Sequence, residues 1–374
     1  MRSPATIRPM DLAAWIWLHR LELPPPKAHR LLDAFGCPEA IRDADPRDLK
    51  NAGADLHADT LARLLAAQAQ TDVSKELDTL DALGAVAIPF PSPAYPSALK
   101  TIPDPSVLLY CRGDMVPEDR MAVAIVGSRR CTHYGRAVAA RLGKDLADRG
   151  ITIVSGLARG VDTEAHQGAL KTGRTLAVLG SGLDVMYPAE NRALADRIAE
   201  NGAVLSEAPL GAQPDAWRFP PRNRIISGLS LGVICVEVPV ASGALRTAAF
   251  ALEQGRSVMA VPGDITNAKN GGCHQLLKDG AALVETAEDV LIELGVPVHA
   301  LPDPPAETLP LPLDLTDDEA RLMDALSLSP VPMEDLIAQT GLPAPKASAA
   351  LMMLEIKGHV KRLAGNAYIR AGYG

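Results

Sequence analysis

The sequence has little of what marks a metalloprotein, a secreted protein or a membrane protein. Its five cysteines are scattered, and no two form a CxxC pair. This argues against a structural zinc site and suits a reducing cytosol. No stretch approaches the about 18 consecutive apolar residues of a membrane span, and the N-terminal segment lacks the apolar run of a signal peptide. We therefore expect a cytoplasmic protein with no membrane span and no bound metal.

Familiar catalytic motifs are missing as well. The sequence contains no GxSxG, no HExxH, no Walker A motif and no clustered acidic metal site. Asp162 and His166 are four residues apart and could share a helix face, as in a hydrolase. Asp162, however, stands where a helix N-cap is expected, and we expect His166 to be a buried, hydrogen-bonded residue. The sequence thus predicts no nucleophile, no enzyme activity and no cofactor.

The composition is that of a globular protein. The chain has 374 residues, of which 47% are hydrophobic and 22% charged, which suits two or three domains. Only 3% are aromatic, so the core must consist of Ala, Val, Leu and Ile. The net charge of −8 excludes a uniformly basic protein. It does not exclude a local basic site, because binding responds to the local field.

Strand-like and helix-like patterns alternate between residues 86 and 295. Apolar runs of strand length lie at residues 123–126, 151–154, 176–179, 203–205, 233–238 and 258–261. Helical patterns lie at residues 136–149, 164–171, 191–200, 244–254 and 273–278. Strands that are apolar on both faces belong in a parallel sheet covered by helices. We predict an α/β fold with a Rossmann-like, doubly wound, mostly parallel sheet.

The flanking regions differ from this core. Residues 1–85 carry apolar stripes near Leu12, Leu31 and Leu61, and Gly36 marks a helix end. This pattern predicts a small helical domain, which resembles a helix-hairpin-helix or sterile-alpha-motif-like module. Such modules sometimes bind DNA, but we favour protein contacts or packing alone.

A linker with six prolines covers residues 296–315 and predicts a semi-rigid spacer. Residues 316–374 then give three helical stripes and two short strands, the order of a winged helix-turn-helix domain. Its acidic residues offset its basic ones. We therefore favour an interaction module over duplex DNA binding.

Three glycine-containing loops follow predicted strands and open helices. They carry the candidate phosphate-binding residues Gly127, Ser128, Arg129, Arg130, Gly156, Arg159, Ser242, Gly243, Arg246 and Thr247. Glycine lets the backbone approach a ligand, helix starts attract anions, and arginine pairs with phosphate. One such loop is a weak signal, and none is the GxGxxG of a dinucleotide site. Since parallel strands end at one edge of a sheet, three loops together predict a track for several phosphates.

Arginines and aromatics are interleaved just before the strand predicted at 233–238. The residues concerned are Trp217, Phe219, Arg222, Asn223 and Arg224. Single-stranded nucleic acid stacks its bases on such rings, at about 1–3 kcal/mol per base, while arginines follow its backbone. Ordinary packing of the two rings is the alternative. We expect the arginines at 129, 222 and 224 to be accessible on one rim; burial in ion pairs would contradict this.

Several segments resemble the DNA-processing protein A family (DprA, also called Smf). They are residues 95–96, 102–105, 108–113, 126–129, 155–166, 182–191, 222–226, 242–248 and 261–263, in the family's order. The most specific are SGLARGVD at 155–162, RNR at 222–224 and SGALRT at 242–247. Two departures are visible: Ser106 replaces a usual proline, and Arg246 replaces a usual aliphatic residue.

The resemblance implies a recombination mediator. Members bind incoming single-stranded DNA in natural transformation, protect it and load RecA onto it, even where single-strand-binding protein coats it. They act as homodimers formed through the Rossmann-like domain. The family's binding positions correspond to residues 127–129 and 222–224, less securely to 242–243, and also to Lys269 and Asn270. We thus expect sequence-independent single-stranded DNA binding.

Two alternatives come from other classes. A nucleotide-binding Rossmann-like enzyme that cleaves an N-glycosidic bond would need a carboxylate beside the glycine loops, for which Glu207 and Glu237 are the candidates. A winged-helix transcription regulator would need sequence-specific duplex binding by residues 316–374.

Overall fold

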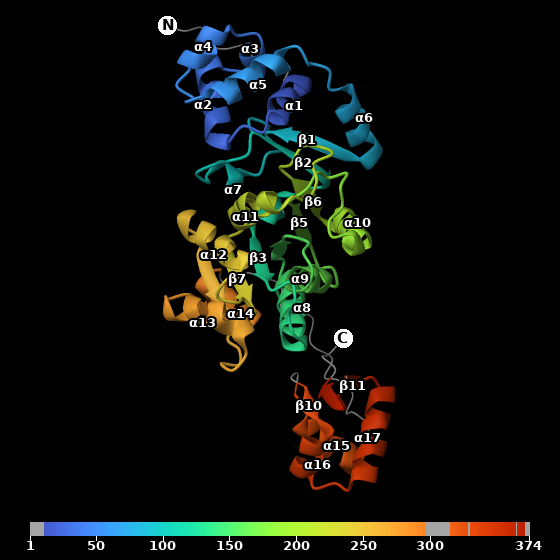
Figure 1. The fold of residues 1–374 in the computed structure, drawn as a ribbon. Coiled ribbons are helices and arrows are strands. Elements are labelled where there is room, and N and C mark those ends of the chain that lie inside the picture. Colours follow the sequence, from blue (N-terminus) through green and yellow to red (C-terminus); the bar gives the residue numbers. More distant parts are fainter. Residues whose placement is uncertain (1–10, 297–314, 328–329, 364, 371–374) are drawn as a thin grey trace.

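A mostly parallel sheet forms the centre of the molecule (Figure 1). The computed structural model describes residues 11–296, 315–327, 330–363 and 365–370. The strands are β1 (Ala85–Pro89), β2 (Leu108–Gly113), β3 (Ala122–Gly127), β4 (Thr152–Ser155), β5 (Thr175–Leu179), β6 (Ala203–Ser206), β7 (Gly232–Val236), β8 (Ser257–Ala260) and β9 (Ala282–Leu283). Their order is β1-β2-β6-β5-β4-β3-β7-β8-β9. Only the pairs β1–β2 and β2–β6 are antiparallel.

Helices cover both faces of this sheet. They are α7 (Ser97–Lys100), α8 (His133–Asp148), α9 (Val161–Ala169), α10 (Arg192–Asn201), α11 (Phe219–Gly228), α12 (Gly243–Glu253), α13 (Gly271–Lys278) and α14 (Ala287–Glu293). Side chains of β3 alternate between the faces: Ala124 and Val126 share a core with residues of α11–α13, whereas Val123 and Ile125 share one with α8, α9 and α14. The predicted doubly wound α/β fold is therefore confirmed.

The six strands and five helices predicted for this region are all present, within a few residues. Helix α11 is not among the predicted helices; it carries two prolines, at 220 and 221, in its first turn. Proline fits the first turn of a helix, where its missing N–H has no intrahelical partner. Arg222 and Arg224 therefore lie on a helix.

The strand order reverses between β3 and β7. After β3 the chain passes through α8 to β4 on one side, and β7 pairs with the other side of β3. Loops at such a reversal diverge and leave a crevice at the carboxyl ends of the strands. Gly127 ends β3 there, and a Cβ at this position would clash with the carbonyl oxygen of Val236.

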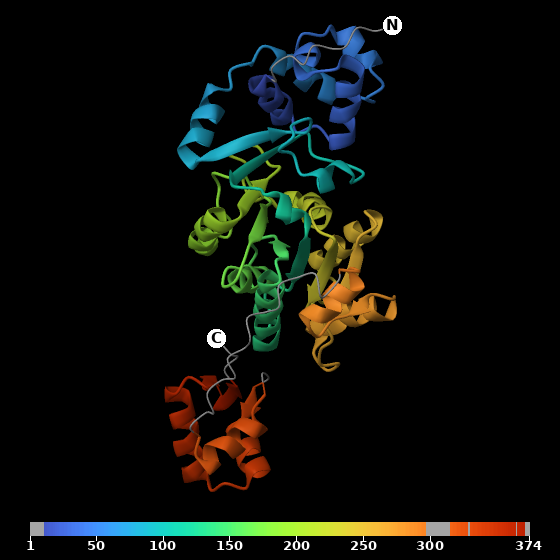
Figure 2. The same ribbon diagram turned by 180° about the vertical axis from the view of Figure 1, so that it is seen from behind.

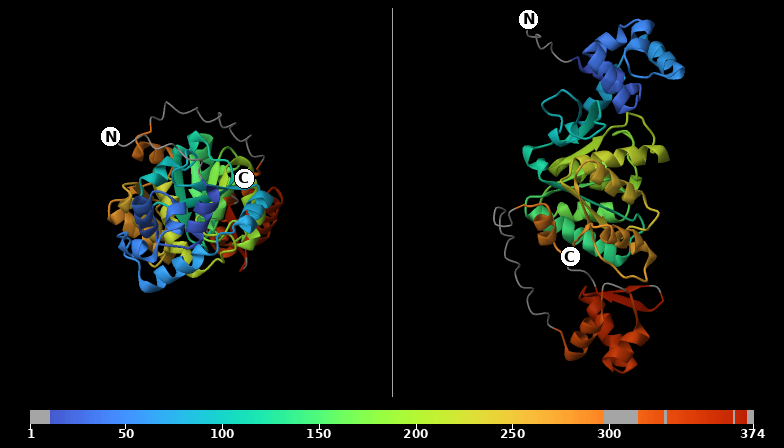
Figure 3. Two further views of the ribbon diagram at one scale, coloured as in Figure 1. Left: turned by 90° about the horizontal axis from the view of Figure 1, so that it is seen from above. Right: turned by 90° about the vertical axis from the view of Figure 1, so that its left-hand side faces the viewer.

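Six short helices precede the sheet and pack against its β1–β2 end (Figure 2 and Figure 3). They are α1 (Leu12–Arg20), α2 (Pro25–Phe35), α3 (Pro38–Arg42), α4 (Pro46–Asn51), α5 (Ala58–Gln68) and α6 (Ser74–Leu83). Gly36, with φ of 83°, ends α2 as expected. Trp15 and Trp17 of α1 share a core with Leu108 and Tyr110 of β2. Hydrophobic contacts thus cross the domain boundary predicted at residue 85, and the boundaries stay predictions.

The C-terminal region is a winged-helix unit, as predicted. It contains α15 (Asp317–Ala325), β10 (Val331–Pro332), α16 (Met333–Thr340), α17 (Ala344–Ile356), β11 (Val360–Leu363) and β12 (Ala367–Arg370). The strands pair in the order β10-β12-β11. Residues 297–314 of the predicted linker lie outside the described residues. Within the described ranges, no helix has both the length and the apolar character needed to cross a membrane.

His166 of α9 lies in the core, as predicted, rather than in a site. Its Nδ1 is 2.7 Å from Oγ1 of Thr175 on β5. That hydroxyl donates to the carbonyl oxygen of Ile153, so it accepts from Nδ1–H and fixes the tautomer. Burial lowers the pKa of His166 to about 3, which keeps the ring neutral at physiological pH.

This burial makes the stability depend on pH. An unfolded histidine takes up a proton below its ordinary pKa of about 6.5, but folded His166 does so only near pH 3. The free energy of unfolding should therefore fall as the pH drops from about 6.5 to about 3, by up to about 1.4 kcal/mol per pH unit from this group. His166→Asn can still donate a hydrogen bond to Thr175 but has no ring to protonate. In urea unfolding, its free energy of unfolding should therefore depend less steeply on pH between about 6.5 and about 3 than that of the wild type. Parallel pH profiles for the two proteins would contradict this account.

Candidate functional site

A cleft of about 580 Å³ opens where the strand order reverses. We call it the switch cleft. Its lining includes the predicted residues Gly127, Ser128, Arg129, Phe219, Arg222, Asn223, Ser242, Gly243, Arg246 and Thr247. The loop after β3, the start of α11 and the start of α12 thus come together, although they lie far apart in the sequence. Thr247 is 1% exposed and so adds little accessible surface.

The switch cleft combines positive charge with aromatic rings. Arg129 is exposed, and its guanidinium lies 5.2 Å from the centre of the Phe219 ring. Tyr187, which is not among the predicted site residues, also lines the cleft, and its ring centre lies 5.7 Å from that of Phe219. The sequence feature that could have identified Tyr187 is its position in the family-like segment 182–191. Arg246 is exposed on the first turn of α12. Among the described residues, Asp162 is the only carboxylate in the lining, against the arginines at 129, 222 and 246, so the cleft is net positive.

The start of α12 is open towards this cleft. The Ser242 hydroxyl caps it by accepting from the Ala244 amide at 3.3 Å. Gly243 is exposed, and no carboxylate caps this helix end among the described residues. Amide donors and the positive end of the helix dipole suit an anion here, and Arg246 adds charge one turn along.

The start of α8 is closed, contrary to expectation. Glu237 is 2% exposed, and its Oε2 accepts from the Thr132 amide at 2.6 Å. Thr132 is the N-cap residue of α8, and its hydroxyl donates to the other oxygen of the same carboxylate. An internal anion therefore takes the place expected for phosphate. Arg130, in the loop before α8, is exposed but does not line the switch cleft.

The loop before α9 is closed too. Gly160, not Asp162, is the N-cap of α9, which corrects the sequence prediction. Oδ2 of Asp162 instead accepts from the amides of Gly156 and Ala158, at 3.1 and 3.3 Å. Burial raises the pKa of Asp162 to about 6, although Arg222 opposes the shift. Arg159 points away and pairs with Glu190.

Arg222 is buried, although it contributes to the cleft. It is 6% exposed, and its Nη1 donates to the carbonyl oxygens of Gly156 and Val178, at the ends of β4 and β5. A Cβ at residue 156 would lie 2.7 Å from Nη2 of Arg222, so the glycine makes room for the arginine rather than for phosphate. Burial lowers the pKa of Arg222 to about 10, against the attraction of Asp162. The group stays charged, and among the described residues its hydrogen bonds go to two carbonyl oxygens and to the Asn223 side chain, not to a carboxylate.

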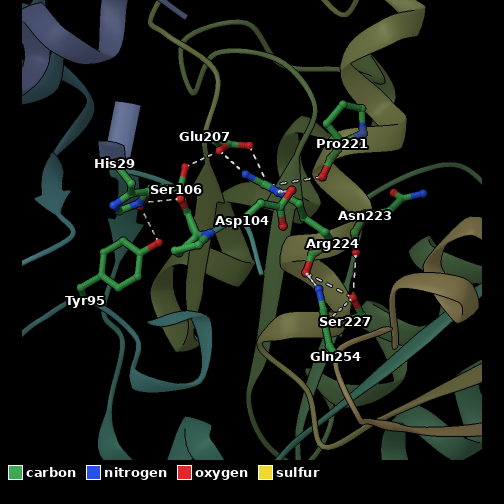
Figure 4. Close-up of polar contacts among 11 residues, drawn as sticks. His29, Tyr95, Asp104, Ser106, Glu207, Pro221, Asn223, Arg224, Ser227 and Gln254 are labelled. Atoms are coloured by element: carbon green, nitrogen blue, oxygen red, sulfur yellow. Dashed lines mark hydrogen bonds and ion pairs between the residues drawn. The ribbon is translucent and has the colours of Figure 1, made fainter. Parts of the chain in front are cut away.

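Arg224 does not line the switch cleft; Figure 4 shows its side chain beside Asp104 and Glu207. It is 2% exposed; its Nε lies 2.8 Å from Oδ2 of Asp104, and two further nitrogens lie 2.9 and 2.5 Å from the oxygens of Glu207. Two carboxylates thus neutralise its charge, which corrects the expectation that it contacts phosphate. Burial alone would raise the pKa of Glu207, but Arg224 and a hydrogen bond from Ser106 hold it below its usual value. The unusual serine at 106 therefore has a structural role.

The remaining predicted residues lie outside the switch cleft. Asn270 is 2% exposed and donates to the carbonyl oxygen of Asp264; neither it nor Lys269 lines the cleft. Trp217 is 60% exposed and lines a neighbouring cavity, with the Arg218 guanidinium 4.1 Å from its ring. The structure places Asn270 at the end of the 3₁₀ helix Ala268–Asn270, directly before α13, and leaves Trp217 available to a ligand.

The two candidate carboxylates of a glycosidic enzyme are engaged elsewhere. Glu237 holds the start of α8, Glu207 holds Arg224, and neither lines the switch cleft. Asp162 does line it but accepts two loop amides. Within the part of the chain that the structure describes, no group of three His, Cys, Asp or Glu side chains is placed to hold a metal ion.

The position of Arg224 gives a test of its role. Arg224→Ala leaves Asp104 and Glu207 without their cation and should lower the free energy of unfolding by about 2–3 kcal/mol. This is below the about 3–5 kcal/mol for a fully buried pair, because both carboxylates are partly exposed. The exposed Arg246→Ala should change it by less than about 0.5 kcal/mol. Chemical denaturation measures the free energy of unfolding of both variants. If Arg224→Ala were as stable as wild type but bound DNA more weakly, Arg224 would belong to the binding site.

Comparisons with known proteins agree with this architecture. A family model described as DNA recombination-mediator protein A matches residues 87–295, and one described as the DprA winged helix domain matches residues 302–366. Protein Smf of Escherichia coli (strain K12) is 40% identical over 287 residues, covering 76% of each chain. DNA processing protein DprA of Bacillus subtilis (strain 168) is 45% identical over 213 residues, 56% of this chain and 72% of that protein.

Two solved structures are similar as well. DNA processing protein A from Streptococcus pneumoniae has a TM-score of 0.67 at 34% identity and covers 75% of this chain and 97% of its own. DNA processing protein A from Helicobacter pylori, described for its single-stranded DNA binding mode, has a TM-score of 0.51 at 31% identity and covers 56% and 95%. The chain belongs to the DNA recombination-mediator protein A family.

Proposed function

We propose that the chain binds single-stranded DNA in the switch cleft, without sequence preference, and presents it to a recombinase. One observation carries the proposal: the open start of α12, the guanidinium groups of Arg129 and Arg246 and the ring of Phe219 all face one net-positive cleft. The described binding mode of the Helicobacter pylori relative supports it.

Phosphates take the α12 amides and the arginines, and bases stack against Phe219 and Tyr187. Contacts to the phosphate backbone carry no sequence information, and every base has a π face, so the binding is insensitive to sequence. A duplex keeps its bases stacked inside the helix and cannot offer them to these rings. The site is shorter than the three-loop track first expected, because two of the helix starts are closed.

The family description supports a mediator role, in which the protein protects incoming DNA during natural transformation. In this role it also loads RecA where single-strand-binding protein coats the strand. We further propose that it acts in the cytoplasm as a homodimer. Its mechanism is positioning rather than bond chemistry. The engagement of Glu207 and Glu237 by Arg224 and Thr132 supports this.

Arg129→Ala should weaken binding to single strands of every sequence about tenfold or more, since it removes a charge-assisted contact. It should also reduce the slope of log affinity against log salt by about 0.7, the value for one phosphate. Fluorescence anisotropy of labelled oligonucleotides measures both. The neighbouring Arg130→Ala is the matched control, because Arg130 is equally exposed but lies outside the cleft. Equal losses in the two variants, or binding that ignores salt, would contradict the assignment.

The mediator role is tested on DNA coated with single-strand-binding protein. Wild type should shorten the lag before RecA filaments form, followed through the DNA-dependent ATP hydrolysis of RecA. Arg129→Ala should not shorten it, and Arg130→Ala should behave as wild type. An unchanged lag with a wild-type protein that binds DNA normally would leave DNA binding intact and reject the mediator role.

A further inference from the structure

A second cavity of about 350 Å³ lies beside the switch cleft, between the N-terminal helices and the carboxyl ends of β5 and β6. Leu18, His19 and Leu23 line it from α1 and the segment after it, and Leu179 and Trp217 line it from the opposite side. We call it the helix-side cavity. Arg222 lines both this cavity and the switch cleft, so the two are neighbours across the start of α11.

The two spaces differ in charge. Glu22, Asp104 and Glu207 line the helix-side cavity, and each is paired with an arginine of the same lining, Arg218 or Arg224. Three carboxylates thus offset its arginines, whereas the switch cleft has a single carboxylate. A phosphate gains little in a balanced lining. A neutral group with both donors and acceptors fits it better.

The lining also holds a buried polar atom without a partner. His19 is 7% exposed, and its Nε2 finds no hydrogen-bond partner among the described residues. Arg218 Nε likewise makes no hydrogen bond, but it lies 3.8 Å from Oδ2 of Asp215. Burial lowers the pKa of His19, so the ring is neutral and Nε2 can donate or accept according to the tautomer. Buried polar atoms of this kind are uncommon in folded proteins and call for an explanation.

Trp217 supplies the aromatic surface at the edge of this cavity. It is 60% exposed, and only one residue separates it from Phe219 in the switch cleft. Trp217 belongs to the short 3₁₀ helix Ala216–Arg218, which directly precedes Phe219 at the start of α11, so a strand bound in the switch cleft has a second, exposed ring nearby.

We propose that the helix-side cavity receives an unstacked base of the strand bound in the switch cleft, stacked on Trp217 and hydrogen-bonded to His19. This inference rests on the proposed function. A nucleobase is planar, neutral and edged with donors and acceptors, which is what the balanced lining and the unpartnered Nε2 can recognise. The cavity volume lies within the about 300–1,000 Å³ of small-molecule sites. The N-terminal helices thereby become part of the DNA site.

The test is a ladder of thymidine oligonucleotides from about 2 to about 16 nucleotides, spanning known site sizes. Trp217→Ala removes the exposed ring, and Leu23→Trp fills the cavity; Val86→Trp adds the same bulk at an exposed position of β1 and is the control. The shortest oligonucleotides, held by the switch cleft alone, should bind all proteins equally. Beyond the length at which wild-type affinity steps up, Trp217→Ala and Leu23→Trp should bind about tenfold more weakly, and Val86→Trp should not.

Intrinsic fluorescence gives an independent readout. Trp15 and Trp17 are 6% and 2% exposed, so quenching by DNA reports on Trp217. This quenching should first appear at the oligonucleotide length at which the wild-type affinity steps up. Wild-type affinity of Leu23→Trp at every length, or an equal loss in Trp217→Ala at every length, would overturn the inference. Arg129→Ala separates the two claims: if it binds as wild type, the proposed function fails; if it alone loses affinity, only the helix-side cavity is rejected.

Discussion

The site depends on which anions satisfy the amides at the starts of three helices. Each start leaves N–H groups without intrahelical partners, and a chain that supplies its own carboxylate leaves nothing for a ligand. Glu237, through Thr132, closes the start of α8, and Asp162 closes the loop before α9. The start of α12 has only the neutral hydroxyl of Ser242. Of these three helix starts, the internal carboxylates thereby leave that of α12 open to the phosphate that we propose.

Helix geometry then gives the two arginines of the segment 222–224 different surroundings. Residues two apart on an α-helix point about 200° apart, and of the two arginines of α11 only Arg222 lines the switch cleft. Arg222 ties the ends of β4 and β5 together and keeps its charge beside the cleft. Arg224 turns to Asp104 and Glu207 beneath the N-terminal helices. The two arginines look like one basic patch in the sequence, but they have different roles. Arg222 contributes charge to the switch cleft, and Arg224 is the centre of a structural ion-pair cluster.

The start of α11 stands between two spaces of different character. On one side the switch cleft is net positive and holds Phe219; on the other the helix-side cavity is balanced in charge and holds Trp217. Phosphate and base are the two chemically distinct parts of a nucleotide. A positive groove with aromatic surfaces suits a single strand, because the backbone follows the charge while the bases find rings. The N-terminal helices matter here as a wall of the second space.

The sequence by itself determined six strands of the mostly parallel sheet, five of the helices that cover it and the family-like glycine loops, since these depend on local periodicity and on turns that few residues allow. It also placed the loops at one edge, because parallel strands end together. Only the tertiary structure decided which charges are free. Arg224 meets Asp104 across 120 residues, and Thr132 meets Glu237 across 105. No local pattern encodes such pairings, because they depend on how distant segments pack, and packing left Arg129 and Arg246 exposed while it neutralised Arg224.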